Sequence, residues 1–378
     1  MNRALGRYRL IAELGRGGMG TVYLAALSGP ARFSKVVVIK QLRPGFAEDP
    51  NLTSMFLEEA RLAARLHHPN IVQTNEVVCD PEDGYFIVME YLEGAALKRV
   101  VRRLRRHGDE PARSIYIAAI LDVLGALQYA HALKDFDGKP MDLVHRDVNP
   151  ANVVVTFGGQ VKLVDFGIAK AADSAQETRA GILKGKLHYM SPEQMAGDRI
   201  DCRADLFAVG AMLWDALAGR KLWEGTSGLD VMTSLVRGNI PSPRSVNPDI
   251  GPDLERVCMR ALAFRPEDRY PDAGSFHADL EHALGSARMP AGEIGAAIQS
   301  EFAEEQEHVR ALIAEQLSLL NDQSAATGRS EPPPLARPDA SGEASAASAA
   351  SVLPPASATA KSSPGTTELS DTVSREAK

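Results

Sequence analysis

The chain has 378 residues, 44% hydrophobic and 24% charged, which is ordinary for a globular protein. Its formal net charge of −7 disfavours a dedicated nucleic-acid binder, because such proteins normally carry a basic surplus. The three cysteines, Cys79, Cys202 and Cys258, are too far apart to form a disulfide framework or a zinc motif, so we expect reduced thiols and a cytoplasmic location. The N-terminus has no apolar stretch of signal-peptide length, and no apolar run predicts a membrane span.

The first 90 residues are predicted to form a small, mostly β unit. Short apolar runs between turn signals predict strands over residues 8–14, 21–26, 36–41 and 86–91. Helical spacing over 52–66 follows the start signal Asp49-Pro50-Asn51 and predicts one helix.

Helices dominate the next part of the chain. The segment 111–131 has the pattern of a long amphipathic helix, and 206–217 is apolar nearly all round. An arginine-rich stretch, 98–107, is interpreted as the solvated face of a helix, with a docking patch for acidic partners as the alternative. The order of a β-rich part followed by a helical part predicts an α+β fold with two lobes.

Two further segments follow residue 284. An apolar stripe over 290–320 predicts a single helix that packs on the preceding domain, and the alternative is a helix for a homodimer or another partner. Ala, Ser, Pro and Thr fill 36 of the 56 positions in 323–378, and no aromatic residue occurs there. Such a segment cannot bury enough apolar surface to fold, so we expect a disordered tail.

The segment from Leu14 to Val22 fits the pattern G-x-G-x-x-G-x-V. Glycines allow a backbone to turn tightly and approach phosphates closely, although a glycine-rich hairpin without a ligand is equally common. Because the loop joins two predicted strands, it does not fit a dinucleotide-binding fold, in which the glycines open a helix. It also lacks the ending of a P-loop.

Several charged and amide residues follow at ordered spacings. Lys40 ends an apolar strand, and Glu59 on the next helix could form an ion pair with it. The decisive stretch is His145-Arg146-Asp147-Val148-Asn149-Pro150-Ala151-Asn152, followed thirteen residues after Asn152 by Asp165-Phe166-Gly167. An Asp on a fixed loop can accept or orient a hydroxyl proton, and Asn and Asp oxygens are ligands that Mg²⁺ takes alongside phosphates.

With these motifs and Tyr189-Met190-Ser191-Pro192-Glu193, the region 8–284 resembles the protein kinase family, specifically the bacterial Ser/Thr kinases of eukaryotic type. The resemblance implies a bilobal kinase domain over 8–284, with its N-lobe over about 8–91 and its C-lobe over about 92–284. The residues 285–322 would be a helical extension and 323–378 the disordered tail.

The resemblance also implies the site. Lys40 would contact the α- and β-phosphates of ATP and pair with Glu59, Asp147 would be the catalytic base or would orient the hydroxyl, and Asn152 and Asp165 would hold Mg²⁺. The residues implied to contact the nucleotide come from the glycine-rich loop, the gatekeeper position, the hinge and the adenine floor: Leu14, Gly15, Arg16, Gly17, Gly18, Met19, Gly20, Thr21, Val22, Lys40, Met89, Glu90, Leu92 and Val154.

Other roles are structural or regulatory. Glu193 would pair with Arg269 to brace the large lobe, and Asp205 would brace the catalytic loop. Thr178 would be an activating phosphosite bound by Arg146, with Ser174 a weaker candidate.

The chain departs from the family pattern at three positions. Asn149 stands where Ser/Thr kinases usually have a lysine that meets the γ-phosphate, Lys186 replaces a threonine before the substrate-docking loop, and Val38 replaces an alanine near adenine. We expect Lys184 or Lys186 to supply the missing cation, or else both to face solvent. The first two departures weaken a Ser/Thr assignment against Tyr.

The resemblance therefore implies an ATP- and Mg²⁺-dependent serine/threonine protein kinase with a signalling role, which autophosphorylates and acts on protein substrates. The alternatives are a catalytically dead scaffold of the same fold and a small-molecule kinase. The Ser191-Pro192-Glu193 segment disfavours the second alternative, because that segment serves protein-substrate docking in the family.

Overall fold

The computed structural model describes residues 3–17, 20–28, 34–43, 49–80, 83–166 and 187–327. The chain divides into two units, Met1–Arg329 and Ser330–Lys378, and the described residues belong to the first.

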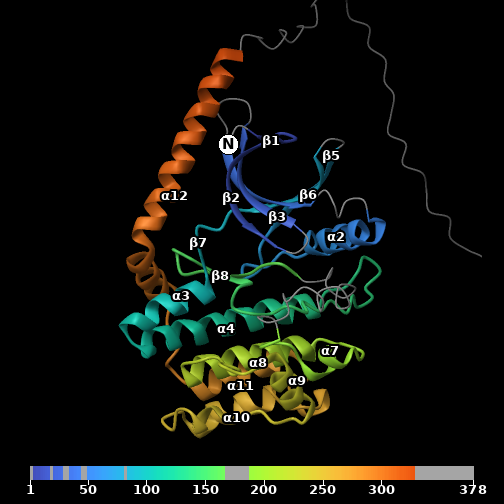
Figure 1. The fold of residues 1–378 in the computed structure, drawn as a ribbon, viewed down its shortest axis with the longest axis vertical. Helices are drawn as coiled ribbons and strands as arrows, with labels where there is room; N and C mark the ends of the chain where they lie inside the picture. Colours follow the sequence, from blue (N-terminus) through green and yellow to red (C-terminus); the bar gives the residue numbers. More distant parts are fainter. Residues whose placement is uncertain are drawn as a thin grey trace, which may run out of the picture. The chain divides into compact units, whose positions relative to one another are not determined.

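The N-lobe is an antiparallel sheet of six strands in the order β1-β2-β3-β4-β6-β5, with one helix beside it (Figure 1). The strands are β1 (Ala4–Leu5), β2 (Tyr8–Arg16), β3 (Gly20–Ser28), β4 (Ser34–Leu42), β5 (Thr74–Asp80) and β6 (Gly84–Glu90). Side chains from one face of the strands build an apolar core, in which Leu10, Ile39, Phe86 and Val88 are fully buried. The four predicted strands are therefore confirmed, and β1 and β5 were not predicted.

The helix of this lobe, α2 (Pro50–Ala63), starts where the sequence predicted. The carboxylate of Asp49 accepts a hydrogen bond of 2.9 Å from the amide of Asn51, and Pro50 occupies the first turn. The helix ends at Ala63, three residues before the predicted end.

The C-lobe is helical and packs around α4 and α8. Its helices are α3 (Leu97–Leu104), α4 (Asp109–His131), α7 (Pro192–Ala196), α8 (Arg203–Ala218), α9 (Gly228–Val236), α10 (Pro252–Ala261) and α11 (Ala273–Leu284), with 3₁₀ turns η2 (Arg105–His107), η4 (Pro243–Ser245) and η5 (Pro266–Asp268). A three-stranded sheet, β7 (Gly94–Ala96), β8 (Val153–Thr156) and β9 (Val161–Leu163), lies on this lobe beneath the N-lobe (Figure 1). The predicted α+β fold with two lobes is confirmed.

Within the described residues, α4 is long and apolar enough to cross a membrane by length and composition. However, 67% of its most apolar stretch is buried inside the C-lobe, against α3, α8 and α11. The apolar composition of α4 and its burial both follow from its position at the centre of the C-lobe core.

A last helix, α12 (Ala291–Thr327), covers the predicted 290–320 segment and continues five residues into the expected tail. Its first apolar residues, Ile294, Ile298 and Phe302, are at most 2% exposed within the C-lobe core. The helix therefore packs on the preceding domain, as predicted, and this part of its stripe is not available to a dimer partner.

The arginine-rich stretch contacts the same helix. Arg99 and Arg103 form ion pairs with Glu305 of α12, and Arg99, Arg102 and Arg106 are exposed. The predicted solvated face therefore holds for Arg99, which stays exposed beside Glu305, and is wrong for Arg103, which is partly buried against α12.

Candidate active site

The glycine-rich segment is the tip of the β2–β3 hairpin, where Gly15 lies opposite Val22 and Arg16 opposite Thr21. The amide of Gly17 donates a hydrogen bond of 2.8 Å to the carbonyl of Gly20. A Cβ at Gly20 would lie 2.8 Å from the carbonyl oxygen of Gln41, so the close approach of β3 to β4 requires glycine there. Leu14, at the edge of this tip, is 51% exposed.

The predicted lysine and the second predicted magnesium ligand meet in the cleft between the lobes. The Nζ atom of Lys40 on β4 lies 3.0 Å from Oδ1 of Asp165, which follows β9. Phe166 is 3% exposed and packs on the ring of His145, with ring centroids 4.5 Å apart. Burial of Phe166 holds the neighbouring Asp165 at the cleft.

The catalytic loop is organised around Asp147. Asn152 donates from Nδ2 to both the carbonyl and Oδ2 of Asp147, at 2.8 and 2.9 Å. Asn149 donates from Nδ2 to the same carbonyl at 2.9 Å and to Oδ1 at 3.2 Å. The residue that replaces the family lysine therefore points back to the Asp147 carboxylate and orients it.

Asp205, at the start of α8, holds the loop from below, as the resemblance implied. Its carboxylate accepts hydrogen bonds of 2.8 Å from the amides of His145 and Arg146, and one of 2.9 Å links it to Nε2 of His131. Complete burial alone would raise the pKa of Asp205, but the hydrogen bond and charge of His131, together with His145, bring the pKa below its ordinary value. Asp205 is therefore held as a carboxylate.

The backbone is strained near Asp147 and at Asp165. Among the described residues, the non-glycine residues with positive φ are Asp142, Arg146 and Asp165, with Arg146 at 66° and Asp165 at 57°. Such conformations are uncommon for L-residues and persist where the surrounding structure fixes them. Here the amide of Arg146 is fixed by Asp205.

Asn152 and Asp165 have a donor set that fits a magnesium ion. The amide of Val164, the residue before Asp165, donates a hydrogen bond of 2.9 Å to the carbonyl of Asn152, so the two ligand-bearing segments run side by side. An amide oxygen and one carboxylate suit Mg²⁺, which binds proteins through one or two carboxylates plus substrate phosphates. No cluster of three or more His, Cys, Asp or Glu side chains is present within the described segments, so a metal cage made by the protein alone is absent from them.

The hinge connects the lobes after β6. Glu90, the last residue of β6 and the first predicted hinge residue, directs its carboxylate to the Nζ atom of Lys162 on β9, at 2.6 Å. The same carboxylate accepts a hydrogen bond of 2.7 Å from the amide of Gln73. Met89, the predicted gatekeeper, lines a cavity of about 20 Å³ together with Lys40 and Phe166.

Lys162 was missed by the sequence analysis, although its position three residues before Asp165 was the available signal. The predicted hinge residue Leu92 lies in the loop after β6, and the predicted floor residue Val154 pairs with Lys162 across β8 and β9.

The segment from Tyr189 to Glu193, predicted to dock substrates, is tied to both the loop of Asp147 and the C-lobe. Gln194, which forms a capping box with Ser191 on α7, donates a hydrogen bond of 3.1 Å to the carbonyl of Arg146. The predicted pair of Glu193 and Arg269 is confirmed as a buried, bidentate interaction at 2.7 and 2.8 Å.

Several predicted site residues lie outside the described part. The backbone of Glu59 belongs to α2, but its side chain is not described, so its pairing with Lys40 stays a prediction. Gly18 and Met19 of the glycine-rich loop also lie outside the described residues, as do four residues of the activation segment: Ser174, Thr178, Lys184 and Lys186. The roles expected for these residues stay predictions.

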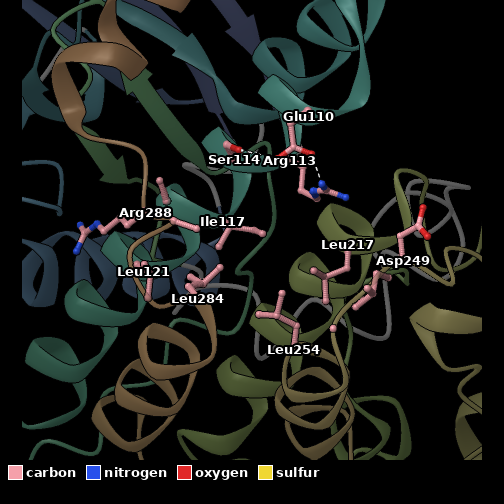
Figure 2. Close-up of a pocket in the computed structure, with 14 residues that line it drawn as sticks. Glu110, Arg113, Ser114, Ile117, Leu121, Leu217, Asp249, Leu254, Leu284 and Arg288 are labelled. Atoms are coloured by element: carbon pink, nitrogen blue, oxygen red, sulfur yellow. Dashed lines mark hydrogen bonds and ion pairs between the residues drawn. The ribbon is translucent and has the colours of Figure 1, made fainter.

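A separate pocket of about 180 Å³ lies in the C-lobe between α4, α8, α10 and α11 (Figure 2). Its floor is apolar, with Ile117, Leu217 and Leu254, and Glu110 and Arg113 form an ion pair at its rim. It contains none of the predicted site residues.

Comparison with known proteins agrees with this geometry. The model of the protein kinase domain matches residues 8–279. The tyrosine-protein kinase MasK of Myxococcus xanthus is 40% identical over 305 residues, which are 79% of this chain and 47% of MasK. The probable serine/threonine-protein kinase SCO3848 of Streptomyces coelicolor is 37% identical over 74% of this chain and 40% of its own length.

Among solved structures, the kinase domain of Mycobacterium tuberculosis PknI is similar, with a TM-score of 0.54, 29% identity, and coverage of 75% of this chain and 98% of that chain. The chain thus spans less than half the length of these curated relatives and nearly the whole of the solved kinase domain. With a kinase-domain match over most of its length and a cleft that joins Lys40 to Asp165, the chain belongs to the protein kinase family.

Proposed function

We propose that this protein is an ATP- and Mg²⁺-dependent protein kinase that phosphorylates serine and threonine hydroxyls of proteins. The observation that carries the proposal is the geometry of the cleft, where Lys40 meets Asp165 and where Asn152 orients Asp147. These are the groups that phosphoryl transfer needs, since its catalysis is largely positioning and charge stabilisation.

Each residue has a distinct role in the proposed reaction. The substrate hydroxyl oxygen forms a bond to the γ-phosphorus while the bond between that phosphorus and the β–γ bridging oxygen breaks and ADP leaves. Asp147 orients the hydroxyl and accepts its proton, with its carboxylate fixed by Asn149 and Asn152. Lys40 supplies a fixed cation for the α- and β-phosphates. Asn152 and Asp165 would hold Mg²⁺, which neutralises phosphate charge when bound.

The competing function is a catalytically dead scaffold of the same fold. Purified protein is mixed with labelled ATP and magnesium, and incorporation of phosphate into the protein or a generic substrate is measured. We expect Lys40→Met and Asp165→Ala each to lower the rate on the order of 10³-fold or more, because the first removes the cation for the phosphates and the second removes a carboxylate that would hold Mg²⁺.

The matched control is Lys35→Met, a lysine on the same strand that is exposed to solvent. It should keep the wild-type rate, and thermal midpoints of all variants should show intact folds. An inactive wild type would support the scaffold, and near-normal activity of either cleft variant would contradict the proposed roles.

The choice of hydroxyl needs its own measurement, because one relative is named a tyrosine kinase and the other a serine/threonine kinase. Asn149 leaves the catalytic loop without the lysine typical of Ser/Thr kinases. Phosphoamino acid analysis of the labelled products should yield phosphoserine and phosphothreonine, and phosphotyrosine alone would contradict the proposed specificity.

We also propose a catalytic domain over 8–284, followed by a helical extension over 285–322 and a tail over 323–378, in a protein that acts in cytoplasmic signalling. The structure adds that α12 packs on the domain, so limited proteolysis should cleave the tail and spare the helix.

A further inference from the structure

The helix α12 is seated in the C-lobe by contact between backbones. A Cβ at Gly159, in the β8–β9 turn, would lie 1.8 Å from the carbonyl oxygen of Ala291, and a Cβ at Gly295 would lie 2.9 Å from that of Phe157. Gln299 donates a hydrogen bond of 2.8 Å from Nε2 to the carbonyl of Phe157. Both sides of this contact therefore use glycine, and the turn that precedes β9 and Asp165 is fixed to the first turns of α12.

The next turn is held by aromatic and charged side chains. Phe302 is 1% exposed, and the guanidinium of Arg103 stacks over its ring at 4.2 Å from the centroid. The same arginine donates to the carbonyl of Glu301, and Arg99 and Arg103 both pair with Glu305. This end of α12 is therefore part of the C-lobe.

The far half of α12 lies against the other lobe. Val309, Leu312, Ile313 and Leu317 pack on an apolar cluster made by Ile11, Leu24 and Ala26, which belong to β2 and β3. The hinge residue Tyr91 packs on the same cluster. Figure 1 shows the helix running from the level of α3 alongside β2.

The middle of the helix stands off from the hinge. A polar hollow of about 330 Å³ separates the two, and Arg310 crosses it to reach the carboxylate of Glu93, at 2.5 Å. This pair is 57% and 39% exposed, so its ion pair contributes little to stability. The apolar contacts of α12 with the C-lobe at one end and with the N-lobe at the other therefore supply most of the stability of its packing.

Through these contacts, α12 connects the N-lobe side of the cleft with its C-lobe side. At one end, α12 holds the base of the β2–β3 hairpin, whose tip carries Gly15 and Gly17. At the other end it holds the turn before β9, whose strand leads to Asp165. From Phe302 to Leu317 the helix spans about 22 Å at 1.5 Å per residue, and a continuous helix changes this length very little.

We propose that α12 is an inter-lobe brace that positions the β2–β3 hairpin over the nucleotide cleft and thereby raises the affinity for ATP. Ile313 and its neighbours are positioning residues, because they act through the hairpin and do not touch the nucleotide. The inference rests on the proposed binding of ATP in the cleft. If the brace is released, fewer molecules hold the binding-competent lobe arrangement, and the apparent affinity falls by the same fraction.

The test compares two aspartates on adjacent positions of α12 in the full chain. Ile313→Asp places a charge against the N-lobe cluster, whereas Ala314→Asp places the same residue at an exposed position of the same helix. We expect Ile313→Asp to raise KM for ATP about three- to tenfold and to change kcat at saturating ATP less than twofold. The conservative variant Ile313→Leu and the control Ala314→Asp should both have the wild-type KM for ATP.

Hydrogen exchange without nucleotide supplies a readout that does not depend on catalysis. Amides of β2, β3 and the hinge should exchange faster in Ile313→Asp, and those of α4 and α8 should not change. The calorimetric Kd for ADP should rise with the KM for ATP.

An unchanged KM and Kd in Ile313→Asp would overturn the brace, as would an equal effect of Ala314→Asp. A joint fall of kcat and of the thermal midpoint would overturn it too, by showing general destabilisation. If the wild type binds ADP but transfers no phosphate, the proposed function fails while the ADP affinities still decide the brace.

Discussion

The pair of Arg269 and Glu193 gives a prediction of large magnitude, because the arginine has no contact with solvent. Its guanidinium makes two hydrogen bonds to the Glu193 carboxylate and three more to the carbonyls of Arg203, Ala263 and Phe264. Arg269→Met keeps an unbranched, apolar chain but removes the charge and all five donations.

The variant leaves Glu193, a residue only 9% exposed, without its cation. Burial raises the pKa of Glu193, and the hydrogen bonds and charge of Arg269, helped by hydrogen bonds from a backbone amide and from Ser191, bring the pKa below its ordinary value. Removing one partner of a buried ion pair costs about 3–5 kcal/mol. That is a large part of the roughly 5–15 kcal/mol by which a typical domain is stable.

Urea unfolding measured by tryptophan fluorescence suits this test, since the chain has two tryptophans, Trp214 and Trp223, and both are buried in the C-lobe. We expect the midpoint to fall by on the order of 1 M urea or more. The control is Arg256→Met, because the Arg256 side chain is 49% exposed in its ion pair with Asp279 and its loss should move the midpoint far less. Equal midpoints for wild type and Arg269→Met would refute the reasoning.

Three further predictions concern titration, orientation and regulation. Burial raises the pKa of Asp215 to about 7 from 3.8; the folded state thus binds this proton more tightly, and the resulting stability is present below about pH 4 and is lost as the pH rises through 7. The unfolding free energy of the wild type relative to Asp215→Asn should therefore fall between about pH 4 and pH 7 and level off above that range, and a constant difference would contradict the shift. Asn149→Ala should lower kcat on the order of tenfold with little change in KM for ATP, because Asp147 loses a fixed donor; an unchanged kcat would exclude this orienting role. Autophosphorylation at Thr178 should raise activity by adding a charge of about −1.5 to −2, and unmodified Thr178 in active protein, together with wild-type rates for Thr178→Ala, would rule this switch out.

The sequence predicted the parts of the site that depend on short, contiguous motifs. The loop from His145 to Asn152 folds by local hydrogen bonds, such as those from Asn149 and Asn152 to Asp147, and its motif names the partners. The start of α2 was predictable for the same reason, because Asp49 caps the helix that it precedes.

Contacts between distant segments were less predictable. Nothing near Arg99 or Arg103 indicates that Glu305, some 200 positions later, neutralises them. Lys162 and Glu90 likewise pair across 72 positions. The strand β5 was missed because its inward face offers little apolar pattern, with Thr74 the one residue of the strand in the buried class.

The cavity beside Met89 has a practical consequence for chemical probes. At about 20 Å³ it has room for about one water molecule, so an inhibitor group that extends past Met89 must displace that side chain or Phe166. Shortening Met89 to alanine would join the space of its side chain to this cavity. With the ATP base beside Met89, as proposed, an ATP analogue with an enlarged base is expected to fit the Met89→Ala protein better than the unaltered protein, and a labelled γ-phosphoryl group on that analogue would mark its targets in a whole-cell extract.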